Sequence, residues 1–151
     1  MDPTSATITF VGFAASLATV ASLVVNSSKT LYNLCRRLKH APEDIERLLR
    51  QLRDYEVLLS ETQHWLQQDE HANALDLQML LSRVGKQMHE DMEGFMDIMR
   101  RVEGLLRGVT PGKRLTLRIR HILQEDAVRE YERLISSHVG TLTLLLTILN
   151  K

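Results

Sequence analysis

The pattern of apolar and polar residues divides the chain into long helical segments. No charged residue stands between Asp2 and Lys29, where small and hydroxyl residues interrupt an otherwise apolar run. We predict one helix from about Ser5 to Leu38, amphipathic from Lys29 onward. Apolar stripes at three- and four-residue spacing predict three more long helices, over residues 43–68, 75–107 and about 124–150.

Breaks between these segments are marked by turn-forming residues. Pro42 precedes the second helix, and the run Gly108–Gly112 predicts a loop. Leu115, Leu117 and Ile119 alternate with polar residues, a period of two that predicts an extended or irregular basic connector. The sequence therefore predicts an all-α helical bundle of four to five helices with a long apolar N-terminal helix, in a single domain over residues 1–151.

The uncharged run at the start of the chain is consistent with more than one environment. As a helix, residues 3–28 would be about 39 Å long, against a bilayer core of roughly 30 Å. An acidic start disfavours a signal peptide, and the frequent hydroxyls make a poor permanent anchor. A buried helix of a soluble bundle is the favoured interpretation for the resting state, and a short strand near Ile8 and Phe10 is an alternative.

We expect this helix to lie in the core at rest and to insert into a membrane when released. The candidate membrane-inserting residues are Ile8, Phe10, Val11, Phe13, Leu17, Val20 and Val24.

Small residues form a stripe along the same helix. Gly12, Ser16 and Thr19 share one face with Thr9, and such faces let helices approach closely in membranes. These three residues are candidates for oligomer packing. The alternative is that the stripe lets the helix sit deep among its neighbours in a soluble core.

Charge is balanced overall but uneven along the chain. The net charge is zero, which removes any global attraction to nucleic acid. Residues 54–82 carry six carboxylates and no Lys or Arg, whereas residues 100–120 carry seven basic residues against Glu103 alone. These basic residues either bind anionic lipid headgroups or pair with the acidic segment. The candidate headgroup-binding residues are Arg100, Arg101, Arg107, Lys113, Arg114, Arg118 and Arg120.

Catalytic, metal-binding and cofactor-binding patterns are missing from the sequence, so we do not expect an enzyme. Glu61 and His64 form one Glu-x-x-His pair, whereas di-metal bundles need two pairs and further carboxylates. Cys35, the single cysteine, fits a reducing compartment; the adjacent arginines could lower its pKa, although a packed helix cysteine is the alternative. His138 lies on an apolar face and is predicted to be a core histidine with a hydrogen-bond partner. Five methionines (Met79, Met88, Met92, Met96, Met99) gather largely on one side of the third helix and predict ordinary core.

Several segments resemble a known family. They are the opening Met1-Asp2-Pro3 before the uncharged helix, the break at residues 41–45, the run Leu117-Arg118-Ile119-Arg120, and the leucine- and threonine-rich segment 141–146. Together they are similar to the HeLo-like N-terminal domain of fungal NLR-like (STAND) receptors, over essentially the whole chain.

This resemblance implies a cell-death effector related in architecture to the four-helix bundle of the mixed lineage kinase domain-like pseudokinase. It implies a role in programmed cell death, fungal innate immunity or heterokaryon incompatibility, with the first helix attacking the membrane after oligomerisation. The expected partners are an anionic phospholipid membrane, further copies of the chain, and a receptor or amyloid-signalling module in cis or in trans. The expected location is the cytoplasm at rest and the plasma membrane on activation. The alternative is a soluble adaptor domain that recruits proteins through helical surfaces.

Overall fold

The computed structural model describes residues 3–37, 43–68, 75–107, 112–123 and 125–149. These ranges contain five helices: α1 (Pro3–Arg37), α2 (Glu43–Gln68), α3 (Leu75–Arg107), α4 (Gly112–Ile122) and α5 (Glu125–Leu149). The predicted all-α class is confirmed, and the alternative strand near Ile8 is wrong because that segment lies inside α1.

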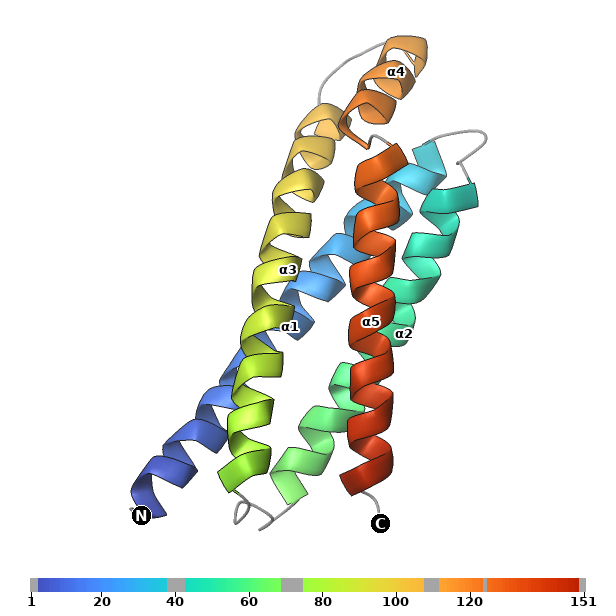
Figure 1. Ribbon diagram of the computed structural model, residues 1–151. Helices are drawn as coiled ribbons and strands as arrows, with labels where there is room; N and C mark the ends of the chain where they lie inside the picture. The colour runs from blue at the N-terminus through green and yellow to red at the C-terminus, as the bar shows by residue number, and fades with distance from the viewer. Residues whose placement is uncertain (1–2, 38–42, 69–74, 108–111, 124, 150–151) are drawn as a thin grey trace.

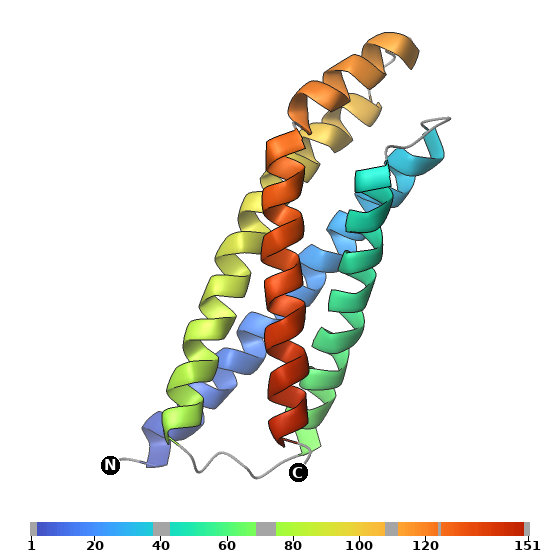
Figure 2. The same ribbon diagram turned by 45° about the vertical axis from the view of Figure 1, so that its right-hand side comes forward.

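Four of the helices form an elongated bundle, and α4 lies at one end of it. α1 begins and α5 ends at the opposite end from α4 (Figure 1; Figure 2). α1 packs mainly against α3 and α2, while α5 packs on α2 and makes fewer contacts with α3. α1 is thus covered by two neighbouring helices along the bundle, whereas the interface between α3 and α5 is smaller.

The core is built from the apolar stripes that the sequence displays. α1 contributes Phe13, Leu17, Val20 and Val24, each at most 2% exposed. Four of the five methionines on α3 (Met88, Met92, Met96 and Met99) are buried, which confirms their prediction as core, while Met79 is 50% exposed. Burial of aliphatic side chains contributes roughly 1.5–3 kcal/mol each relative to exposure, and this packing is the main source of bundle stability.

The predicted connector at residues 115–120 is wrong, because this segment is helix α4. Apolar and polar residues alternate here, but residues 115, 119 and 122 also follow the four- and three-residue spacing of one helix face. Ile119 is 1% exposed, whereas Leu117, on another face, is 65% exposed. A period of two over five residues therefore cannot distinguish a strand from a short helix with one exposed leucine.

A buried polar contact joins α3 to α5. Nε2 of His138 donates a hydrogen bond of 2.6 Å to Oδ2 of Asp91, and the two side chains are only 10% and 15% exposed. The predicted core histidine with a hydrogen-bond partner is confirmed. Tyr55 of α2 places its ring 6.0 Å from that of His138, and its hydroxyl is buried without a hydrogen-bond partner among the described residues. Burial, and then the charge of Asp91, raise the pKa of Tyr55.

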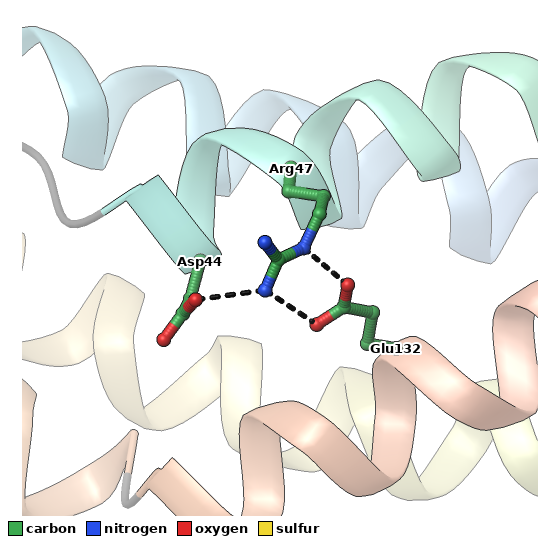
Figure 3. Close-up of polar contacts among 3 residues, drawn as sticks. All are labelled: Asp44, Arg47 and Glu132. Atoms are coloured by element: carbon green, nitrogen blue, oxygen red, sulfur yellow. Dashed lines mark hydrogen bonds and ion pairs between the residues drawn. The ribbon is translucent and has the colours of Figure 1, made fainter.

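A second polar contact joins α2 to α5 near the start of α2 (Figure 3). Arg47 donates to both carboxylate oxygens of Glu132 and, at 2.8 Å, to Asp44 one turn earlier. Glu132 is 18% exposed and Arg47 is 44% exposed, so the contact lies at the rim of the bundle. It links α2 to α5 at this end of the bundle.

Candidate functional site

The residues predicted to insert into a membrane form part of the core. Phe13, Leu17, Val20 and Val24 are buried, so the bundle holds them away from solvent. Ile8, Phe10 and Val11 lie within α1, but their side chains fall outside the described part of the structure. Among the described residues, none of the helices has both the length and the hydropathy needed to cross a membrane.

The water-facing side of α1 is unusual, because it carries no charge along its first part. Among the described side chains between Phe13 and Ser28, the exposed ones are Ala15, Ala18, Thr19, Ser22 and Asn26. An ordinary surface helix carries charged side chains on its exposed face, as α2 does with Glu46, Arg50 and Arg53. α1 is therefore free of charge on both its buried and its exposed faces until Lys29.

The predicted oligomer-packing stripe is divided between two environments. Ser16 is partly buried against α3 at Gly85, where an added β-carbon would lie 3.4 Å from the Ser16 Cβ and 3.0 Å from the Phe13 ring. Thr19 is exposed, and its hydroxyl donates to the Ala15 carbonyl at 3.2 Å. The surroundings of Gly12 fall outside the described residues. One member of the stripe thus serves packing within the bundle, and another is accessible.

The predicted headgroup-binding residues lie on α3 and α4. Arg100 pairs with Asp97 at 2.7 Å, and Arg107 pairs with Glu103 at 2.8 Å. These partners belong to α3 itself and not to the acidic segment of residues 54–82. Arg101, Arg118 and Arg120 are exposed, and the side chains of Lys113 and Arg114 fall outside the described residues.

A polar cleft between α1 and α3 was not predicted. It has a volume of about 800 Å³, and its lining residues come from the end of each helix: Asn26, Lys29, Thr30, Asn33, Arg36, Arg37, Met96, Glu103, Leu106 and Arg107. The ribbons of α1 and α3 separate toward the end of the bundle that carries α4 (Figure 1; Figure 2). The polar residues spaced by three and four along α1 could have indicated one wall of this cleft. The residues of α3 that face them are about seventy positions later in the sequence, so the sequence does not show that the two walls meet.

Four cations and one carboxylate line this cleft. Lys29, Arg36 and Arg37 come from α1, and Arg107 comes from α3 together with its partner Glu103. Arg37 also donates to the Leu106 carbonyl, in the last turn of α3. The final carbonyls of a helix have no partner within the helix and carry partial negative charge, so a guanidinium is well placed there. Arg37 thereby ties the end of α1 to the end of α3.

Other candidate chemistry gives no assembled centre in the described part of the chain. No group of three or more His, Cys, Asp or Glu that could hold a metal ion occurs there. Cys35 is partly buried, and burial, followed by the charge of Glu46, raises the pKa of its thiol; the nearby Arg53 opposes this shift. The suggestion that neighbouring arginines lower this pKa is therefore wrong, because desolvation at Cys35 outweighs the lowering effect of Arg53.

Long helices around one core, with a polar cleft between two of them, define the chain as a helical-bundle domain. No curated protein and no solved structure matches the chain significantly. A family model does match, over residues 9–150. The chain belongs to the family described as the N-terminal region of the pigment biosynthesis cluster protein PigL, a family of fungal N-terminal helical domains related to HeLo-like domains.

Proposed function

We propose that this domain is a membrane-directed cell-death effector that is activated when copies are clustered. Under this proposal it lies in the cytoplasm at rest and acts at an anionic plasma membrane, under the control of a receptor or amyloid-signalling module. Its relation to HeLo-like domains supports the proposal. The observation that carries it is the uncharged exposed face of α1, formed by Ala15, Ala18, Thr19 and Ser22.

The absence of charge on this face matters energetically. A charged side chain at the centre of an inserted helix costs about 2.5–3.5 kcal/mol on translocon insertion scales, whereas α1 has no charge to desolvate before Lys29. Its buried face, with Leu17, Val20 and Val24, supplies the apolar surface.

The proposed sequence of events has three steps. Clustering by a partner module raises the local concentration of the domain. Exposed arginines, including Arg101, Arg118 and Arg120, then attract anionic lipid at about 1 kcal/mol per basic residue near the surface. Finally α1 leaves the bundle and inserts with copies of itself, and residues such as Thr19 pack at the contact between helices.

A charge placed on the exposed face of α1 tests the proposal without disturbing the core. We expect Ser22→Asp to fold like the wild type, because Ser22 is exposed in the bundle. It should reduce leakage from anionic vesicles by roughly two orders of magnitude when the protein is clustered through a fused tetramerising tag, following the roughly 2.5–3.5 kcal/mol insertion penalty.

Ser60→Asp is the matched control, since Ser60 is also an exposed serine and lies within α2. This variant should leak like the wild type, with circular dichroism and thermal melts showing that both variants are folded. Equal leakage by the two variants would exclude α1 as the membrane-active element.

A second function, a soluble interaction domain that acts as an adaptor, is favoured by apolar exposure on α5. Leu144 and Ile148 are 62% and 55% exposed and lie one helical turn apart. Such a pair is a suitable anchor for another helix. A clustered wild type that causes no leakage, together with a partner complex that Leu144→Gln/Ile148→Gln disrupts, would support the adaptor function instead.

A further inference from the structure

We infer that the cleft between α1 and α3 binds a small anion that carries two or more phosphate groups. The cleft volume of about 800 Å³ lies within the roughly 300–1,000 Å³ range of small-molecule sites. The lining is polar over most of its α1 side, where Asn26, Lys29, Asn33 and Arg36 follow one another at three- and four-residue spacing.

The charge in the cleft differs from that of the chain as a whole. Lys29, Arg36, Arg37 and Arg107 against Glu103 give four positive charges and one negative charge, a local excess of three in a chain of zero net charge. Clustered charges in a concave site create a focused potential that concentrates small ions of opposite sign. An excess of three is better matched by a multivalent anion than by a monovalent one.

The types of donor favour phosphate. Arginine presents a planar fork of N–H groups that matches phosphate oxygens in two-point contacts, and lysine adds a compact positive charge. The side chains of Asn26 and Asn33 add neutral amide donors at the same wall. Arg37 already donates to the Leu106 carbonyl, which orders this side of the cleft before any ligand arrives.

Binding in this cleft has a structural consequence, because its two walls belong to different helices. An anion held by Lys29 and Arg36 on one side and by Arg107 on the other bridges α1 to α3. A ligand that binds only the docked arrangement stabilises it by mass action. The anion therefore holds α1 in place, whichever process would otherwise release that helix.

Tripolyphosphate is the probe for the site, measured by calorimetric titration of the intact protein in solution without a membrane. We expect the variant Lys29→Gln/Arg36→Gln to bind it at least tenfold more weakly than the wild type. Arg83→Gln/Lys86→Gln removes the same number of exposed charges from the other half of α3 and should bind like the wild type. Equal losses in the two variants, or no loss in the first, would overturn the assignment of the cleft.

Two ligand controls test the chemistry. Orthophosphate, with a single phosphate group, should bind at least tenfold more weakly than tripolyphosphate. Citrate, which carries three carboxylates, should also bind more weakly, and affinity equal to that of tripolyphosphate would overturn the choice of phosphate. Hydrogen exchange should slow in both residues 29–37 and residues 103–107 on binding. Slowing confined to one helix, or absent from both, would overturn the bridging role.

A free metabolite and a lipid headgroup are two sources of the same chemistry. Vesicles that contain phosphatidylinositol bisphosphate are compared with phosphatidylserine vesicles of equal surface charge. The site is assigned to the lipid headgroup if the wild type prefers the vesicles with phosphatidylinositol bisphosphate, if Lys29→Gln/Arg36→Gln loses this preference, and if tripolyphosphate competes with the vesicles. Tripolyphosphate binding in solution without that preference assigns it to a free anion. Because the titration needs neither leakage nor a membrane, its failure is distinguishable from failure of the proposed function.

Discussion

Replacing His138 by leucine removes one partner of the buried contact between α3 and α5. The bond to Asp91 is 2.6 Å long, and its two side chains are 10% and 15% exposed. The variant leaves the Asp91 carboxyl in a site with little access to water. Removing one partner of a buried pair costs about 3–5 kcal/mol, and the remaining exposure favours the lower end, about 3 kcal/mol.

The chain offers a matched control on α3, the helix that carries Asp91. His89 and Glu93 form a pair of the same residue classes at 3.3 Å, with side chains 41% and 46% exposed. Exposed pairs contribute about 0–1 kcal/mol, so His89→Leu should change the free energy of unfolding by no more than that. Urea titrations followed by circular dichroism measure both variants, provided that the slope with denaturant stays constant.

The double variant Asp91→Leu/His138→Leu completes the test. Replacing both partners by apolar residues leaves no unpaired polar group, so this protein should be more stable than His138→Leu alone. The reasoning is refuted if His138→Leu and His89→Leu cost the same. It is also refuted if the two substitutions at the buried pair simply add, because they would then show no coupling.

Three further predictions concern single positions. Tyr55→Phe removes a buried hydroxyl that has no hydrogen-bond partner among the described residues, so the free energy of unfolding at pH 8 should stay the same or rise. Folding raises the pKa of Tyr55 above its ordinary value near 10, so the wild type should lose stability above about pH 10. Unfolding curves measured at pH 8 and pH 10.5 should show a smaller loss of stability in the variant than in the wild type. Cys35, whose pKa is raised, should react with a disulfide reagent more slowly than a cysteine peptide at pH 8, and an equal rate would contradict its desolvation. Gly104→Ala, which meets nothing within 4 Å, should raise stability by about 0.5–1 kcal/mol, whereas Gly85→Ala, with its β-carbon 3.0 Å from Phe13, should lack that gain in thermal melts.

The sequence by itself determined the helices, because each long helix repeats its apolar residues often enough to define a period. The bounds of α2 and α3 agree with the prediction, and α1 and α5 differ from it by a few residues at most. The prediction failed at α4, where eleven residues are too few to separate the two periods and Leu117 stays exposed. The sequence also predicted His138 correctly as a core residue with a hydrogen-bond partner, because a polar residue on an apolar helix face is buried and needs such a partner.

The tertiary structure alone decided which distant residues meet. Asp91 interrupts the stripe of α3, but nothing local shows that His138, 47 residues later, receives its hydrogen bond. Arg37 and Arg107 likewise face one cleft only because α1 and α3 lie side by side and separate at one end. Local periodicity is set within a few residues, whereas a cleft or a buried pair depends on how whole helices pack, and that depends on the combined fit of all their side chains.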